Sequence, residues 1–296
     1  MRRLPSAIVV IILCLWAKVL PAAEDATAKQ GLTNPFFALC ISTHDARYRT
    51  PHDQAKLLKE LGYAGNCHLW CEGVPEALRA VDDHGLRLFQ IYVRASIDPN
   101  QPKYDPRLRE AIRLLNGRET IVGLLISGMP PSSVEGDPRA VAIVREIGEM
   151  AGESGLRVAL YPHAGDWLQR VEDAVRVAQK VDRKNVGVTF NLCHWLMVDD
   201  ERNMRQVLKL AMPHLFVVTI NGTRRGVSPS SREGWIQTLD RGTFDNYGLL
   251  RTLKELGYTG PIGLQCYGIQ GDVRDNLARS MRTWREFSAR IAAEQP

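Results

Sequence analysis

Short runs of β-branched and apolar residues alternate with longer stretches of helical periodicity, eight times over, between Phe36 and Ile291. Each strand that follows such a helix is expected to pair in parallel with the strand before it, because the helix carries the chain back across the sheet. Eight strand–helix units in 296 residues suit a closed barrel better than an open doubly wound sheet. The pattern therefore predicts a single (β/α)8 TIM barrel over residues 35–296.

The same periodicity predicts where each element of the barrel lies along the chain. Strands are predicted at Phe36–Ser42, Asn66–Trp70, Arg87–Val93, Thr120–Ser127, Arg157–Tyr161, Val186–Phe190, Leu215–Ile220 and Pro261–Gln265. Helices are predicted at Gln54–Leu61, Pro75–Asp83, Arg107–Leu115, Pro138–Ala151, Val171–Val181, Met204–Ala211, Tyr247–Leu256 and Val273–Ile291.

The N-terminus has the layout of a secretory signal peptide. Arg2 and Arg3 precede a nearly unbroken apolar run from Ala7 to Leu20, and small residues follow before Glu24. The apolar run is short for a membrane span. We therefore expect a signal peptide at residues 1–23, a polar linker at 24–34 and an exported protein that has no membrane anchor after cleavage.

Composition limits the class of partner. The chain is 45% hydrophobic and 24% charged, with a net charge of +5, as in an ordinary globular protein. The basic residues are scattered and form no clustered patch with interleaved aromatic residues, which argues against a nucleic-acid partner. Oligomeric state cannot be read from these features.

In a TIM barrel the active site lies where the strands end at their carboxyl side. Polar and aromatic residues at these ends form the candidate site: His68, Trp70, Tyr161, His163, Asn191, His194, Asn221 and Gln265. Strand alternation places Asn191, Asn221 and Gln265 on the inward side.

Around these positions the sequence resembles the xylose-isomerase-like barrels, a superfamily of sugar phosphate isomerases and epimerases. The resemblance covers roughly Phe36 to the C-terminus. It is carried by the segments Val158–His163, Val186–His194, Leu215–Asn221 and Leu239–Asp245, and by the passage Leu253–Gln265. It implies a small-molecule carbohydrate as the ligand.

The resemblance also implies a divalent metal, held in that family by two Glu, an Asp and a His at four strand ends. Here those positions hold Tyr161, Asn191, Asn221 and Gln265. Hard cations prefer anionic oxygen ligands, and amide groups supply no charge and do not titrate. We therefore expect no cofactor. A softer metal held by His163 and His194, with Tyr161, stays open as an alternative.

His163 and His194 are the groups at the site that titrate near neutral pH, and they are the candidates for catalytic acid and base. Tyr161, Asn191, Asn221 and Gln265 are hydrogen-bonding groups suited to orienting a sugar, and His68 with Trp70 could form a stacking wall. The resulting hypothesis is an exported isomerase or epimerase, or a lyase, that acts on a sugar or oxidised sugar derivative by proton transfer. The alternatives are a carbohydrate-binding pseudoenzyme and a purely structural or partner-binding barrel.

Overall fold

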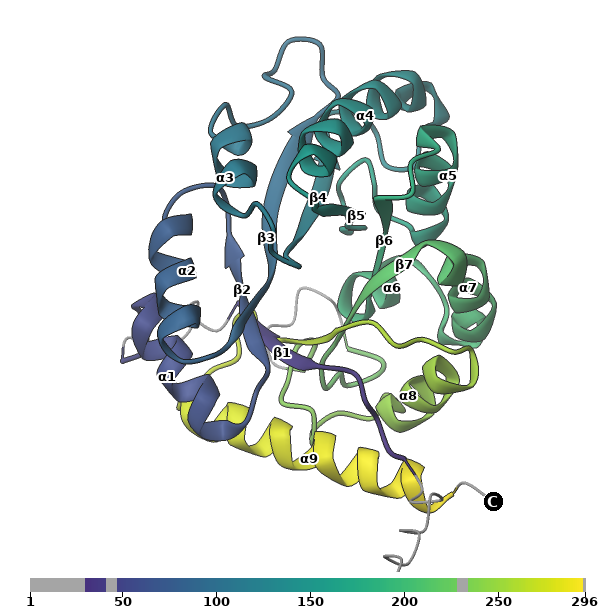
Figure 1. The fold of residues 1–296 in the computed structure, drawn as a ribbon. Helices are drawn as coiled ribbons and strands as arrows, with labels where there is room; N and C mark the ends of the chain where they lie inside the picture. The colour runs from purple at the N-terminus through teal and green to yellow at the C-terminus, as the bar shows by residue number, and fades with distance from the viewer. Residues whose placement is uncertain (1–29, 41–46, 228–233, 295–296) are drawn as a thin grey trace, which may run out of the picture.

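A computed structural model describes residues 30–40, 47–227 and 234–294 of the protein. The strands form a closed parallel barrel in which β1 pairs with both β2 and β8. Figure 1 shows the helices arranged around the ring of strands, with α9 running along one side beside α1 and α8. The predicted (β/α)8 TIM barrel is confirmed. The predicted signal peptide and most of the predicted linker lie outside the described residues.

Each strand of the barrel follows its neighbour in sequence order around the ring. The strands are β1 (Phe36–Leu39), β2 (Gly65–Leu69), β3 (Arg87–Ser96), β4 (Ile121–Ser127), β5 (Arg157–Leu160), β6 (Val186–Asn191), β7 (Leu215–Ile220) and β8 (Ile262–Gln265).

The connecting helices cover the outside of the barrel. They are α1 (Pro51–Leu61), α2 (Val74–Asp83), α3 (Leu108–Leu114), α4 (Asp137–Glu153), α5 (Val171–Val181), α6 (Leu192–Val198), α7 (Met204–Ala211), α8 (Asn246–Glu255) and α9 (Val273–Ala293). Single turns of 3-10 helix lie at η2 (Val134–Gly136), η3 (Glu201–Asn203) and η4 (Met212–His214).

Sequence periodicity predicts α5, α7 and β7 with the bounds that the structure has. Helix α6 is the element that it misses. This helix is only seven residues long and begins directly after β6, so it is too short to show a helical period of its own. As a result, His194 lies in the first turn of a helix and not at the end of an extended strand.

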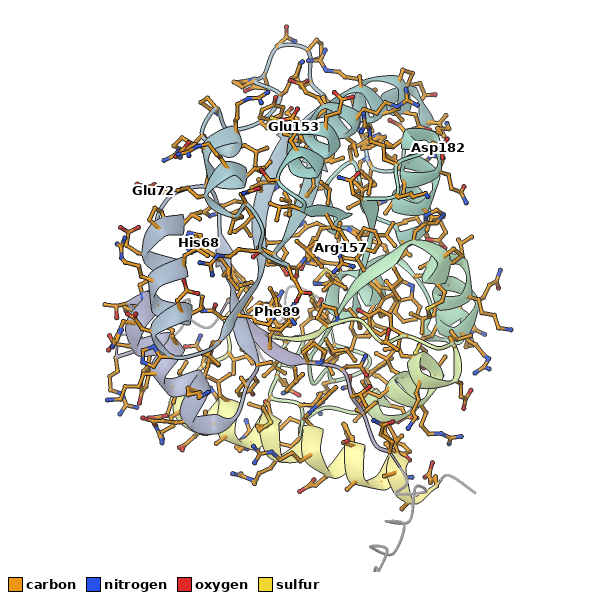
Figure 2. All side chains as sticks on the ribbon, in the orientation of Figure 1. His68, Glu72, Phe89, Glu153, Arg157 and Asp182 are labelled. Carbon is orange, nitrogen blue, oxygen red and sulfur yellow. The ribbon has the colours of Figure 1, made fainter. Side chains whose placement is uncertain are left out.

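Two apolar layers hold the barrel. The larger one packs the helices against the outward faces of the strands. The smaller one fills the barrel interior and consists of Phe37, Leu39, Phe89, Tyr92, Ile121, Leu125, Ala159, Tyr161 and Val217. Phe37 and Phe89 stack with their ring centroids 4.8 Å apart, and Figure 2 shows Phe89 near the middle of the ring of strands. This interior is a packed core, as expected for a barrel of this size.

Two glycines have specific roles in this framework. Gly62 ends α1 in the left-handed conformation, with φ of 85°, which glycine adopts at low cost. At Gly263 in β8, a Cβ atom would lie 2.5 Å from the Phe37 ring, so a side chain there would displace the stacked aromatic pair.

The structure gives four of the cysteines as free thiols: Cys67, Cys71, Cys193 and Cys266. None of the helices in the described ranges is long and apolar enough to cross a membrane.

Candidate functional site

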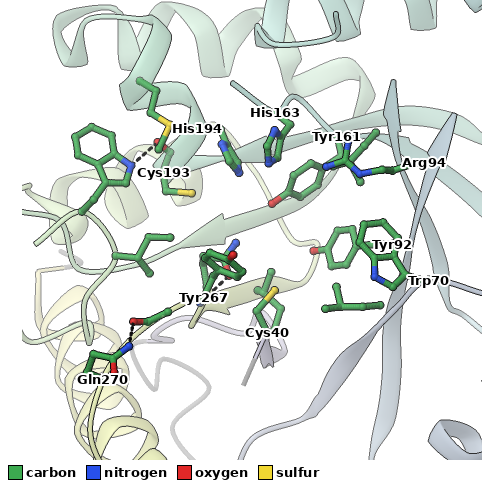
Figure 3. A pocket seen from close by; sticks show the side chains of 18 of the residues that line it. Cys40, Trp70, Tyr92, Arg94, Tyr161, His163, Cys193, His194, Tyr267 and Gln270 are labelled. Atoms are coloured by element: carbon green, nitrogen blue, oxygen red, sulfur yellow. Dashed lines mark hydrogen bonds between the residues drawn. The ribbon is translucent and has the colours of Figure 1, made fainter. Parts of the chain in front are cut away.

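A cavity of about 870 Å3 opens where the strands end at their carboxyl side. Its lining comes from the ends of several strands and from the loops that follow them: Leu39, Cys40, Arg49, Leu69, Trp70, Tyr92, Arg94, Leu125, Tyr161, His163, Cys193, His194, Met197, Trp235, Ile236, Gln265, Tyr267, Gly268 and Gln270. Figure 3 shows the two histidines side by side on one wall, next to Tyr161 and Arg94.

The hydroxyl of Tyr161 lies at the centre of the hydrogen-bonded groups on the cavity floor. Tyr161 directly follows β5, and its backbone N–H donates to Leu124 O across 2.8 Å. The side-chain amide of Asn191 donates to the Tyr161 hydroxyl oxygen. A further hydrogen bond from Gln265 favours the phenolate, but burial has the larger effect and raises the pKa of Tyr161 well above 10. Tyr161 is therefore a phenol at neutral pH.

The amide groups of Asn191 and Gln265 have their oxygens turned away from this hydroxyl. Asn191 Oδ1 caps α6 by accepting the backbone N–H of His194 at 3.2 Å, and it also accepts the thiol of Cys193. Gln265 Oε1 accepts the backbone N–H of Tyr267 at 3.1 Å. Because both oxygens are used in this way, the amides are left to present N–H groups to Tyr161.

His163 lies in a tight turn after β5. Its backbone N–H donates to Leu168 O at 2.9 Å, and its backbone oxygen accepts the N–H of Asp166 at 3.0 Å. This turn brings the Asp166 carboxylate back over the ring, with 3.5 Å between Oδ2 and His163 Nδ1. Nδ1 makes no closer hydrogen bond to any described residue. The carboxylate can therefore stabilise a proton on this histidine.

His194 packs against His163, with 3.9 Å between the ring centroids. Its Nδ1 accepts a long hydrogen bond of 3.4 Å from the backbone N–H of Ala164. Burial, together with the neighbouring His163 and Arg94, lowers the pKa of His194 from 6.5 to about 3. His194 is thus neutral at neutral pH and acts as a hydrogen-bonding group there.

The pKa of His163 is also lowered, mainly by burial. Asp166 opposes this effect by favouring the charged ring, while Arg94 adds to it. His163 is the more exposed of the two histidines and the one with a carboxylate partner, so it is the better proton acceptor of the pair.

Arg94, at the end of β3, connects two walls of the cavity. Its Nη1 donates to Asp166 Oδ2 at 3.1 Å, and its guanidinium lies 5.7 Å from the centroid of the Trp70 ring. Trp70 is 44% exposed and has a φ of 70°, which is uncommon for a bulky side chain. The Trp70 ring is thus held at the cavity mouth with one face toward Arg94.

The structure brings most of the predicted site residues together. Trp70, Tyr161, His163, His194 and Gln265 line the cavity, and Asn191 lies buried directly behind Tyr161. The remaining two are not among the lining residues.

His68 contacts the backbone oxygen of Glu72 in the loop before α2, and Figure 2 shows both residues on the α2 side of the barrel. The Asn221 amide donates to Thr223 Oγ1 at 2.6 Å and to Trp235 O at 3.1 Å, inside the loop after β7. Asn221 Oδ1 is buried without a hydrogen-bond partner in the described parts of the chain. Asn221 therefore organises the loop that carries Trp235.

Chain position near a strand end also selects Arg94 and Tyr267 and places the Asp166 carboxylate nearby, but sequence reasoning does not find Arg49 or Trp235, which the structure places in the cavity lining. Arg94, Asp166 and Tyr267 follow strand ends closely, so their position in the chain is a usable signal. Trp235 lies far along the loop after β7, and its indole N–H donates to Cys193 O at 3.1 Å. Nothing in the local sequence indicates that contact.

A divalent cation of the kind that the family resemblance implies does not fit the residues at these four strand ends. The side chains are neutral, and the oxygens of Asn191 and Gln265 are already engaged by backbone N–H groups. Among the described residues, no three His, Cys, Asp or Glu side chains are grouped so that they could hold a metal ion. Hard cations need anionic oxygens to replace their bound water.

Comparisons with known proteins agree with the barrel fold. A family model described as xylose isomerase-like TIM barrel matches residues 55–287. The 3-keto-D-glucoside 4-epimerase from E. coli is 18% identical, with a TM-score of 0.65 over 84% of this chain and 99% of that chain. D-allulose 3-epimerase from Methylomonas sp., in complex with D-allulose, is 17% identical, with a TM-score of 0.67 over 87% and 97%.

A xylose isomerase-like TIM barrel protein from Mycobacterium smegmatis, in complex with magnesium, is 20% identical, with a TM-score of 0.64 over 88% of this chain and 98% of that chain. Among curated protein sequences there is no significant match. At these identities the solved structures support the fold, while the family model matches most of the chain.

Proposed function

Because the chain belongs to the xylose isomerase-like TIM barrel family, we propose that it transfers a proton between carbons of a sugar or oxidised sugar derivative. The observation that carries this proposal is the pairing of a protonated Tyr161, held by amide donors, with a His163 that is backed by Asp166. An electrophile and a base on one cavity wall are the two groups that proton abstraction beside a carbonyl requires.

In the proposed step, His163 takes a proton from the carbon next to the sugar carbonyl, the C–H electron pair forms a C=C bond, and the carbonyl π pair moves to the carbonyl oxygen. The resulting enediolate oxygen accepts the Tyr161 O–H. That proton is available because amide donors satisfy the phenol oxygen, and burial keeps it in place. Asp166 stabilises the imidazolium that forms on His163. His163 then returns the proton to the former carbonyl carbon, while the hydroxyl proton of the enediolate passes to the former carbonyl oxygen, so that the carbonyl now stands on the neighbouring carbon.

The positions of the two histidines favour proton transfer on one face of the substrate. Their rings are 3.9 Å apart on the same wall, so they do not lie on opposite sides of a sugar. Isomerisation can use a single base that returns the proton to the adjacent carbon. Epimerisation through two bases on opposite faces is a poorer match to this geometry. Elimination also needs only one base, so a lyase reaction is compatible with the same wall.

Two further parts of the proposal concern the absence of a metal requirement and the export of the protein. The neutral donor set supports chemistry without the divalent metal of the family resemblance. The order of basic, apolar and small residues before Glu24 supports export through a signal peptide. Within the exported protein, the amide-bound Tyr161 would supply the polarisation of the sugar carbonyl.

A carbohydrate-binding pseudoenzyme is the second candidate. One observation favours it: the pKa of His194 is held near 3 and that of His163 is also lowered, so both histidines are weak bases. In such a protein the same cavity binds a sugar without moving its protons.

Solvent-deuterium exchange separates the two candidates. The mature protein is incubated in D2O with a panel of aldoses, ketoses and uronates, and mass spectrometry measures deuterium at carbon. An enzyme incorporates deuterium into at least one sugar. His163→Gln should slow this exchange about 100-fold or more, the scale of lost acid–base catalysis. Replacing both histidines with Gln should abolish it without loss of the fold.

His52→Gln serves as the matched control, because His52 is an exposed histidine on α1 that is not among the residues lining the cavity. Exchange that survives the double substitution would remove both histidines from the mechanism. Saturable sugar binding without any exchange would establish the pseudoenzyme instead.

Elemental analysis of natively purified protein, before any chelator is added, tests the metal part of the proposal on its own. We expect far less than one equivalent of Mn, Zn or Co per chain. About one equivalent per chain would contradict our interpretation of the four strand-end residues and restore a metal-assisted reaction.

A further inference from the structure

The charge of the cavity lining carries an inference about the ligand. Among its described lining residues are two arginines, Arg49 and Arg94, and no aspartate or glutamate. Both histidines in the lining are neutral, because burial lowers the pKa of each. The described wall of the cavity is therefore net positive, in a fold whose resemblance implies carboxylates at the same end of the barrel.

Of the two arginines, Arg49 has the side chain with fewer polar contacts. It is exposed, and its guanidinium makes no ion pair or side-chain hydrogen bond to any described residue. Its backbone oxygen, in contrast, accepts the Gln54 side chain in the turn before α1. The backbone is thus held while the charged end is left to solvent and to whatever enters the cavity.

The charge of Arg94 is partly neutralised by Asp166, but part of its guanidinium group remains available to bind a ligand. Its hydrogen bonds to Asp166 come from Nη1 alone, at 3.1 and 3.4 Å. Asp166 is not among the lining residues, and its side chain is 15% exposed, whereas that of Arg94 is 46% exposed. The Trp70 ring orients the guanidinium at 5.7 Å. Nε and Nη2 make no hydrogen bond to the described residues, and this edge of the fork matches a planar oxyanion.

We propose that the ligand of this cavity is an anionic sugar whose carboxylate or phosphate group binds to Arg49 and Arg94. This inference rests on the proposed function and specifies its substrate class. The sugar ring would then contact the apolar and hydrogen-bonding wall formed by Trp70, Tyr161 and Gln265. Arginine is the side chain best suited to planar anionic groups, through two parallel N–H donors.

Titration calorimetry with matched sugars tests the proposal on the full mature chain. The probes are glucose, glucuronate and glucose 6-phosphate, followed by the galactose and mannose series. We expect at least one anionic sugar to bind about tenfold or more tightly than its neutral counterpart, with an affinity that falls as salt is added. The uronate and phosphate arms show which oxyanion is recognised.

Arg49→Gln removes a charge that touches neither histidine, and it should erase most of the preference for the anionic sugar while leaving weak neutral binding intact. Arg94→Gln should do the same and also alter the pH profile of exchange, because Arg94 contacts Asp166. Arg282→Gln is the matched control: it removes an exposed cation on α9 that forms no ion pair with the described residues and should change no affinity.

Equal binding of neutral and anionic sugars, or a preference that survives Arg49→Gln and Arg94→Gln together, would overturn the anionic-ligand proposal. Deuterium exchange into a neutral sugar, measured separately in D2O, would still leave the proposed function standing. Failure of all the sugars to bind would count against both proposals.

Discussion

At the scale of single residues, the site depends on which end of each amide faces the cavity. The oxygens of Asn191 and Gln265 are taken by backbone N–H groups, so the amide hydrogens point toward Tyr161. A phenol that accepts hydrogen bonds from its neighbours keeps its own proton for a substrate oxygen. In the proposed reaction, this proton would be donated to the enediolate oxygen as it develops negative charge.

Tyr161→Phe should therefore lower turnover about 100-fold, with little change in KM, because the lost hydrogen bond strengthens only as charge develops. Deuterium-exchange rates at saturating and limiting sugar give the two constants. Tyr258→Phe is the matched control, since Tyr258 is buried outside the cavity lining and its hydroxyl donates to Pro261 O at 2.8 Å. Equal losses in the two variants would show a packing effect and contradict the donor role of Tyr161.

At the scale of elements, the short helix α6 links the barrel to the candidate site. Asn191 ends β6 and caps α6, and His194 occupies the first turn of that helix. The same side chain therefore joins the strand end, the helix start and Tyr161. A substitution of Asn191 is therefore expected to affect the end of β6, the start of α6 and Tyr161.

Asn191→Ala should destabilise the protein by about 1 to 2 kcal/mol through the lost cap, and it should also slow deuterium exchange, because Tyr161 loses a donor. Chemical denaturation and the exchange assay measure the two effects. Asp245→Ala is the control: Asp245 caps α8 by accepting the Gly248 N–H at 2.8 Å and lies outside the cavity lining. It should lose comparable stability and keep its activity. Unchanged activity in Asn191→Ala would separate the cap from the reaction.

At the scale of the whole molecule, burial of neutral histidine links folding to pH. The folded pKa of His194 is about 3, below its ordinary value of 6.5. As pH falls below 6.5, His194 binds a proton in the unfolded chain but stays neutral in the folded chain, so the free energy of unfolding decreases. The loss continues until pH falls through the folded value and then levels off.

Between pH 6.5 and 4.5, the wild-type free energy of unfolding should fall by up to about 1.4 kcal/mol per pH unit on account of His194. His194→Gln removes that contribution, so its unfolding free energy should decline less steeply over the same range. Denaturant titrations at several pH values measure both slopes. Parallel slopes for the two proteins would contradict a strongly lowered pKa at His194.

Much of the barrel could be predicted from periodicity alone. Strands such as β7 and helices such as α5 and α7 carry apolar residues at the spacing of their own geometry, and their predicted bounds match the structure. The helix α6 escapes prediction because seven residues are too few for a helical period to stand out beside a buried strand.

The site was predictable where it follows the barrel rule. Trp70, Tyr161, His163, His194 and Gln265 come directly after or within strand-end segments, so chain position alone brings them to the cavity. His68 and Asn221 satisfy the same rule, yet their side chains are engaged in the loops before α2 and after β7. The direction in which a side chain points at a strand end depends on local hydrogen bonds, which one sequence does not reveal.

The sequence by itself determined the parallel barrel and the end of it that holds the site, because both follow from local periodicity and from the order of the elements. Only the tertiary structure decided which amide atoms face Tyr161, that Asp166 lies over His163, and that Arg49 and Arg94 share one cavity. Arg49 and Arg94 come from loops and strands far apart in the chain. Their meeting depends on how the closed ring brings those segments together, which no local pattern encodes.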